Sequence, residues 1–248
     1  MKDDLFKSNG TQSYEEWLRK DRLKVNKKDK YVTNQRKNKN GLDYDLFADN
    51  IIAKSFEAAG PAAEIVADVL ARSTESDAHS SNGELVAHQV LSLIDNCEDL
   101  NFTLKNLDTN YTRALDYEGA ESKLYLPEED DFIIKVQDWS VQSKTPLDYL
   151  TDRIILHNLL FQETPYQLYG FGFEEDSNEL KFIVTQPFIC GRPATLEEID
   201  SYMLSLGFEK KESSYVFNSI EISDLNPRNV LVDENNRIYV IDEIIHTL

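Results

Sequence analysis

The stretch SDLNPRNVLVDENNRIYVID, residues 223–242, decides the fold because polar side chains frame a run that otherwise has the pattern of a buried hairpin. Apolar residues alternate with polar ones on both sides of the turn residues 234–236, which predicts two short strands joined by a tight turn. Asn229 enters this hairpin and Asp242 leaves it. Folding of the hairpin is therefore expected to return the two side chains to neighbouring points.

The polar residues of this stretch have the chemistry of a metal and phosphate site. Asn229 and Asp242 offer hard oxygen atoms, which suit Mg²⁺ bound alongside phosphate oxygens. Asp224, in the loop before the hairpin, is then free to face a substrate hydroxyl. The alternative is an Asx turn around Pro227 before an ordinary strand. A carboxylate directly after the apolar run IYVI has no packing purpose, and this favours a metal and phosphate site over a simple turn.

The elements upstream of this stretch predict an α+β fold. YTRALDYEG, SKLYLPEE and DDFIIKVQDW predict three successive antiparallel strands, and YQLYGFGFEE with KFIVTQPFI predicts a further hairpin. Residues 146–161 have the apolar period of a helix, and so do residues 195–208, where Thr195 and Glu198 have capping-box spacing. YVFNSIEIS is expected to be one strand.

The N-terminal part has a different composition. The chain of 248 residues carries a net charge of -19, yet residues 1–40 hold 12 Lys and Arg against 6 Asp and Glu. We interpret residues 1–40 as a basic, partly disordered arm and residues 41–105 as a helical extension, with a helix break at Gly60-Pro61. The acidic remainder disfavours nucleic-acid binding, so only the arm is a candidate for nucleic acid or an acidic partner.

Other sequence features exclude several classes of protein. No run of about 18 apolar residues exists, and the first residues lack the apolar core of a signal peptide, so we expect a cytoplasmic protein without a membrane span. Cys97 and Cys190 are too few for a disulfide framework and lack metal-ligand spacing.

The residues of the 223–242 stretch resemble the catalytic loop of the protein-kinase-like fold. The loop from Asp224 to Asn229 has that family's catalytic Asp and metal-binding Asn at the family spacing, and Ile241-Asp242-Glu243 resembles its second metal-binding position. Lys135 in FIIKV, on the third predicted strand, corresponds to the phosphate-binding lysine. More narrowly, LHNLLF, TQPFICGRPAT and DLNPRNVLVD resemble the kinase domains of bacterial polyvalent proteins of phages and mobile elements, especially of Bacteroidetes.

The resemblance implies a minimal kinase-like domain over residues 106–248, with ATP and Mg²⁺ as cofactors. Its N-lobe, residues 106–188, is expected to be a five-stranded antiparallel sheet with one main helix, and residues 189–248 a much reduced C-lobe. Asp224 would orient or deprotonate the acceptor, and Arg228 would supply charge in place of the catalytic-loop lysine, whose position is occupied by Asn226.

The sequence also departs from the kinase pattern. The glycine-rich loop of kinases is missing, and Gly119 is the one glycine at its expected position. The backbone amides around Gly119 and Ser122 are therefore the candidates for binding a phosphate. The usual Glu partner of the lysine is missing, and Asp152 is its candidate replacement. Gln186 and Phe188 occupy the expected adenine-binding hinge.

Three functions remain open at this stage. The first is transfer of the γ-phosphate of ATP to a protein hydroxyl, and the second is nucleotide binding by a pseudokinase that serves as a scaffold for a partner protein. The third is phosphorylation of a small molecule, as in aminoglycoside kinases. The IDE sequence at residues 241–243 favours it, and so does the expectation that the domain lacks an activation segment.

Overall fold

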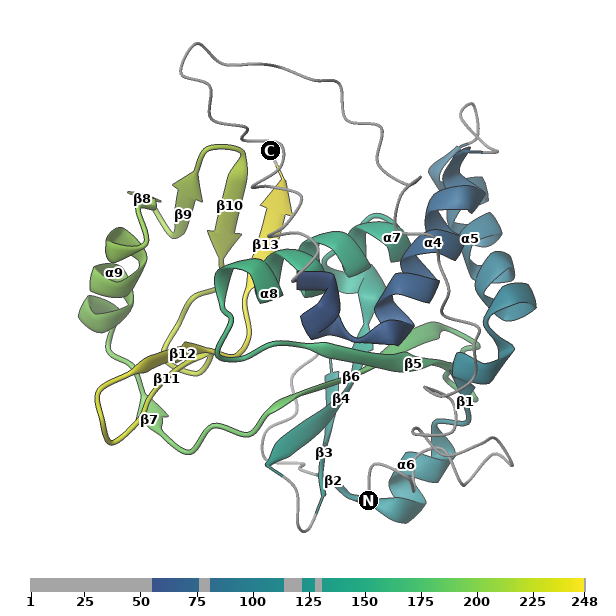
Figure 1. The fold of residues 1–248 in the computed structure, drawn as a ribbon, viewed down its shortest axis with the longest axis horizontal. Helices are drawn as coiled ribbons and strands as arrows, with labels where there is room; N and C mark the ends of the chain where they lie inside the picture. Colours follow the sequence, from purple (N-terminus) through teal and green to yellow (C-terminus); the bar gives the residue numbers. More distant parts are fainter. Residues whose placement is uncertain (1–54, 76–80, 114–121, 128–130, 248) are drawn as a thin grey trace.

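The computed structural model describes residues 55–75, 81–113, 122–127 and 131–247. The predictions for the basic arm and for Gly119 lie outside these residues. The described chain is a mixed α+β structure with three sheets, and Figure 1 shows a large sheet with helices on it beside a smaller C-terminal part.

The large sheet has six strands in the order β1-β5-β6-β4-β3-β2. Five of them form the predicted antiparallel set, and the sixth, β1, pairs in parallel with β5. The expectation of a five-stranded sheet is therefore wrong by one strand. The bounds are Asn101–Phe102 for β1, Thr112–Arg113 for β2, Ser122–Leu126 for β3, Phe132–Asp138 for β4, Gln167–Phe173 for β5 and Leu180–Pro187 for β6.

Two glycines of β5 permit the pairing with β1. A Cβ atom on Gly172 would lie 2.5 Å from the carbonyl oxygen of Phe102 and 2.7 Å from a methyl carbon of Leu104. A Cβ atom on Gly170 would collide with the carbonyl oxygen of Leu100. These glycines serve a close backbone approach in a strand, not a nucleotide loop.

Helices form in the segments 146–161 and 195–208, whose apolar periods predict them, although residues 149–155 are π-helical. Residues 55–59 are helical, and Gly60 (φ +84°) ends that segment before Pro61 begins α4. The bounds are Pro61–Glu75 for α4, Asn82–Asn96 for α5, Glu98–Leu100 for η2, Lys105–Asn110 for α6, Trp139–Val141 for η4, Pro146–Asp148 for α7, Tyr149–Ile155 for the π-helical η5, Leu156–Leu160 for α8 and Leu196–Ser205 for α9.

Segments α7, η5 and α8 form one continuous helix, called here the 146–160 helix. It lies with α4 and α5 on one face of the large sheet, and α6 lies on the other face (Figure 1). Strand alternation decides which side chains meet these layers. Ile134 and Val136 pack on the α6 side, so Lys135 and Gln137 of the same strand point to the 146–160 helix.

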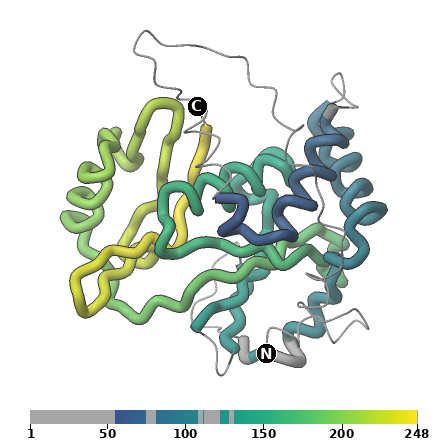
Figure 2. The backbone as a smooth tube through the Cα atoms, in the orientation of Figure 1, coloured from purple at the N-terminus to yellow at the C-terminus, as the bar shows by residue number. Residues whose placement is uncertain are grey.

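The C-terminal part contains two small sheets with α9 packed against them. Their strand orders are β13-β10-β9-β8 and β12-β11-β7. The last strand, β13, returns beside the 146–160 helix, as the yellow end of the tube in Figure 2 shows. The bounds are Arg192–Pro193 for β7, Glu209–Lys211 for β8, Ser214–Phe217 for β9, Ile220–Ser223 for β10, Val230–Val232 for β11, Ile238–Val240 for β12 and Ile244–Thr247 for β13.

The segment YVFNSIEIS is a hairpin and not the single strand that its composition predicts. Asn218 has a φ of +53°, and the chain reverses there between β9 and β10. Asn tolerates this left-handed conformation better than most residues, which makes a two-residue turn possible inside an otherwise strand-forming run.

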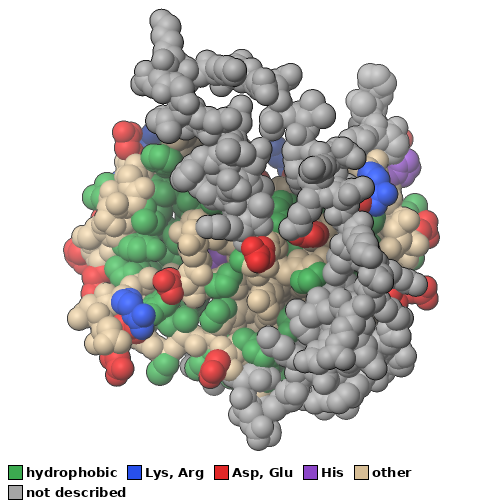
Figure 3. Space-filling view, in the orientation of Figure 1, with side chains coloured by type: hydrophobic (Ala, Val, Ile, Leu, Met, Phe, Trp, Pro, Cys, Tyr) green, Lys and Arg blue, Asp and Glu red, His purple; other side chains and the backbone are tan. Residues whose placement is uncertain are grey.

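Helices α4 and α5 share one apolar core with β5, β6 and the 146–160 helix. The division at residue 105 stays a prediction. Among the described helices, none is both long and apolar enough to cross a membrane. On the face drawn in Figure 3, hydrophobic side chains gather on the side of α9 and its neighbouring strands, where Leu196, Leu204, Leu206 and Phe217 are exposed.

Candidate functional site

The hairpin returns Asn229 and Asp242 to each other, as its pattern predicts. Val230 pairs with Val240 in the antiparallel register of β11 and β12. Just beyond that pair, the backbone N–H of Ile241 donates to the carbonyl oxygen of Asn229 at 2.9 Å. The amide of one candidate metal residue and the carboxylate of the other therefore start from adjacent points of the backbone.

Asp224 is held in the loop before the hairpin by two side-chain amides. Asn226 Nδ2 donates to one carboxylate oxygen at 3.0 Å, and Asn229 Nδ2 donates to the other at 2.9 Å. Asp224 has a φ of +57°, a sparsely populated conformation of the kind that persists at functional sites. Because Asn229 directs its nitrogen to Asp224, its amide oxygen is the end left for a cation. Arg228, in the same loop, is exposed.

Lys135 is buried, with 4% of its surface exposed, at the centre of the site. Its Nζ donates to the carbonyl oxygen of Ile241 at 2.9 Å and to the hydroxyl of Tyr166 at 3.2 Å. Burial lowers the pKa of Lys135, and the nearby carboxylate of Asp242 opposes that shift. Two of its three hydrogens are used by these partners, which leaves one for a ligand.

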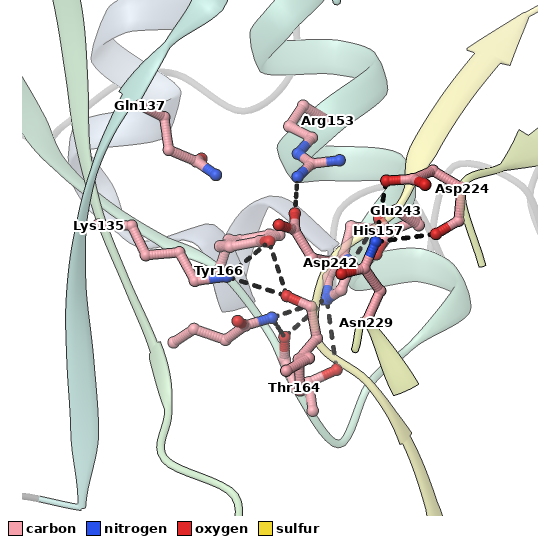
Figure 4. Close-up of polar contacts among 12 residues, drawn as sticks. Lys135, Gln137, Arg153, His157, Thr164, Tyr166, Asp224, Asn229, Asp242 and Glu243 are labelled. Atoms are coloured by element: carbon pink, nitrogen blue, oxygen red, sulfur yellow. Dashed lines mark hydrogen bonds and ion pairs between the residues drawn. The ribbon is translucent and has the colours of Figure 1, made fainter. Parts of the chain in front are cut away.

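Asp242 forms an ion pair with Arg153 of the 146–160 helix, shown in Figure 4. The side chain of Asp242 is 37% exposed, whereas the side chain of Arg153 is 5% exposed. Burial tends to raise the pKa of Asp242, but Arg153 and Lys135 outweigh this effect and hold it below its ordinary value. The sequence prediction missed Arg153, although its spacing from Tyr149 and His157 places all three on one helix face.

Asp152 does not take the role of the missing Glu. Its carboxylate accepts a hydrogen bond from Thr247 Oγ1 at 3.3 Å, while Lys135 donates to Ile241 and Tyr166. Burial raises the pKa of Asp152. Consecutive residues of a helix point in different directions, so Asp152 faces β13 when Arg153 faces the site. The prediction that Asp152 partners Lys135 is wrong in this structure.

A buried polar network lies behind the site. His157 Nδ1 is 2.8 Å from Glu243 Oε1, and both side chains are fully buried. His157 Nε2 is 2.7 Å from the carbonyl oxygen of Thr164, which also accepts from Gln186 Nε2 at 3.0 Å. That carbonyl can only accept, so Nε2 donates to it, and Nδ1 faces the carboxyl group of Glu243. The network anchors the residue that follows Asp242.

Of the remaining predicted residues, Gln186 contributes to the buried network, and Phe188 and Ser122 lie at the ends of strands of the large sheet. Gln186 is 1% exposed and uses its side chain in the buried network. The N–H of Phe188 donates to the carbonyl oxygen of Asp131 at 2.7 Å, and its ring is exposed. Ser122 opens β3 opposite Gln137.

The donor set fits a magnesium nucleotide. The described residues contain no cluster of three or more His, Cys, Asp or Glu that would hold a metal by itself. Magnesium bound with phosphates needs only one or two protein carboxylates, and Asn229 and Asp242 would supply an amide oxygen and a carboxylate. The buried cations Lys135 and Arg153 lie beside Asp242, where phosphate oxygens would complete the coordination.

A lysine on a sheet strand, a loop with Asp and Asn, and a second Asp after the following hairpin define the kinase-like class of phosphotransferases. A family model described as Serine/Threonine/Tyrosine Kinase found in polyvalent proteins matches residues 87–248. The match covers well over half of the chain, which therefore belongs to this family. A search of curated proteins found no match.

Proposed function

We propose that this protein transfers the γ-phosphate of ATP to the hydroxyl group of a protein, with Mg²⁺ as cofactor. The observation that carries the proposal is the convergence at residues 241–243, where Lys135 from the large sheet meets Asp242 and Asn229 from the C-terminal hairpin. These groups come from both parts of the molecule, as expected for a nucleotide site between two lobes.

Each side chain has a distinct role in this proposal. Lys135 binds the phosphates with its remaining donor, and Asn229 and Asp242 hold Mg²⁺, which neutralises phosphate charge when bound. Asp224 accepts the proton of the substrate hydroxyl or orients it. Both of its oxygens receive an amide hydrogen but keep a further lone pair for that hydroxyl. The chemistry is positioning with electrostatic stabilisation.

The description of the matching family supports a protein hydroxyl as the acceptor, because that family is one of serine, threonine and tyrosine kinases. The acceptor protein is recognised outside the buried cluster. We also propose that residues 1–105 contribute to partner recognition and that the protein acts in the bacterial cytoplasm.

A second candidate function is nucleotide-dependent scaffolding without catalysis. Two contacts favour it: Arg153 already occupies the carboxylate of Asp242, and the N–H of Phe188 at the expected hinge is bonded to Asp131. A protein that bound a nucleotide through Lys135 alone would keep its fold and lose phosphoryl transfer.

Thermal unfolding with and without Mg·ATP tests the nucleotide site. A ligand at about 100 times its dissociation constant stabilises a protein by about 2.7 kcal/mol, which is a clear shift of the midpoint. We expect this shift in wild type, a much smaller one in Asp242→Ala, and the full shift in the surface variant Lys123→Ala. The absence of any shift in wild type would contradict the proposal.

Transfer of labelled phosphate then separates the two functions. We expect Asp224→Asn to bind Mg·ATP like wild type and to lose on the order of 10²–10³ in transfer rate to itself or to a protein acceptor. Binding without any transfer by wild type would establish the scaffold. Transfer to small molecules alone would establish the small-molecule phosphotransferase.

A further inference from the structure

Arg153 has one buried N–H donor group that forms no hydrogen bond within the part of the chain that the structure describes. Its Nη2 pairs with Asp242, but Nη1 is buried and has no hydrogen-bond partner among the residues that the structure describes. Buried donors are rarely left unsatisfied, and a guanidinium presents several donors in a planar fork. Nη1 of Arg153 is therefore available to a ligand beside Asp242, the candidate metal ligand.

Before any ligand binds, Arg153 has Asp242 as its ion-pair partner, and a second cation, Lys135, lies nearby. The Cζ of Arg153 lies 5.9 Å from the ring centroid of Tyr166, and Lys135 Nζ lies 5.1 Å from the same centroid. Asp242 pairs with Arg153, whereas the other carboxyl group nearby, that of Glu243, pairs with His157. A divalent cation on Asp242 would remove the partner of Arg153.

A buried arginine cannot respond to that loss by giving up its proton, because guanidinium remains charged in proteins. It must find another anion, since a buried charge without a partner is strongly destabilising. A nucleotide brings that anion together with the cation. Phosphate oxygens match the planar fork of a guanidinium and can accept two parallel hydrogen bonds from it.

We infer, on the basis of the proposed function, that Arg153 is a second phosphate-binding residue that gives up Asp242 to the divalent cation and takes a phosphate oxygen in exchange. The 146–160 helix thus supplies a cation at the place where the kinase resemblance implies an acidic partner for Lys135. Before the ligand arrives, the same ion pair keeps the metal-binding carboxylate occupied.

Calorimetric titration with ATP in EDTA tests the exchange without any metal. Asp242→Asn removes the internal competitor, so the variant is expected to bind ATP at least about 10-fold more tightly than wild type. Adding Arg153→Met to Asp242→Asn should abolish this gain. The double variant leaves neither charge unpaired, which protects the fold, and circular dichroism checks that each variant is native.

Titrations in Mg²⁺ test the same residue under working conditions. Arg153→Met is expected to weaken ATP binding by roughly 10- to 100-fold, the value of one charge-assisted hydrogen bond, and Arg153→Lys is expected to retain part of the affinity. Binding of Mn²⁺ alone, followed by its electron paramagnetic resonance signal, should be tighter in Arg153→Met than in wild type, because Asp242 is no longer occupied.

The outcomes separate this inference from the proposed function. Wild type that binds Mg·ATP while Arg153→Met binds it equally well would overturn the inference alone. The same holds if Asp242→Asn shows no gain in EDTA. Wild type that binds no ATP under any condition would overturn the proposed function, and the inference with it.

Discussion

The buried pair His157 and Glu243 offers a sharp test of how the site is anchored. Both side chains are fully buried, and Glu243 Oε2 has no hydrogen-bond partner within the described chain, so His157 is the neighbour that satisfies this carboxyl group. Substitution of His157 by Leu removes that neighbour at similar side-chain volume. The carbonyl of Thr164 keeps its bond from Gln186 at 3.0 Å, so the loss falls on Glu243.

The magnitude follows from the cost of leaving a buried polar or charged group alone. We expect His157→Leu to lower the free energy of unfolding by about 2–5 kcal/mol. For a protein of this size that corresponds to a fall in Tm of roughly 4–20 °C. The double variant His157→Leu and Glu243→Leu replaces the pair by apolar groups and should recover most of the loss, to within about 1.5 kcal/mol of wild type.

Urea denaturation of wild type, both single variants and the double variant completes a double-mutant cycle. Lys123→Ala is the surface control: its ion pair with Glu174 is 2.6 Å long but partly exposed, and should contribute at most about 1 kcal/mol. If His157→Leu were as stable as this control, or if the losses of the two single variants simply added in the double, His157 and Glu243 would not act as a pair.

Two further predictions concern the sheet and the ion pair. Gly172→Ala should lower the free energy of unfolding by about 1–3 kcal/mol, because its Cβ would lie 2.5 Å from the carbonyl oxygen of Phe102. The control Gly83→Ala, in open space on α5, should be neutral or stabilising. Equal thermal midpoints of the two variants would contradict this prediction. Partial burial tends to raise the pKa of Asp242, but Arg153 and Lys135 hold it below its ordinary value. The stability that its ionised form contributes is therefore present above the unfolded pKa of about 3.9 and is lost as pH falls through the lower folded value. The difference in unfolding free energy between wild type and Asp242→Asn should therefore be constant between about pH 5 and pH 7 and shrink below about pH 4; a difference that grew in acid would refute the role of the pair.

The sequence by itself determined the elements whose signals are local. Alternation and turn residues predict the hairpin that brings Asn229 to Asp242, and the register of β11 and β12 confirms it. The capping box at Thr195 and the break at Gly60 likewise lie within a few residues of the helix ends they set. These signals survive without a tertiary context because each depends on backbone preferences over one or two turns.

Only the tertiary structure decided which side chains of the 146–160 helix serve the site. Asp152 and Arg153 are neighbours in sequence, and the direction of the helix against β13 and the 241–243 segment selects Arg153, whose partner Asp242 lies 89 residues away. The parallel pairing of β1 with β5 depends equally on a distant contact. Packing between segments far apart in the chain determines both the direction of Arg153 and the pairing of β1, and the local periodicity of the sequence does not predict such packing. The sequence therefore determined where the candidate metal-binding oxygens lie, and the packed structure decided which cation faces them.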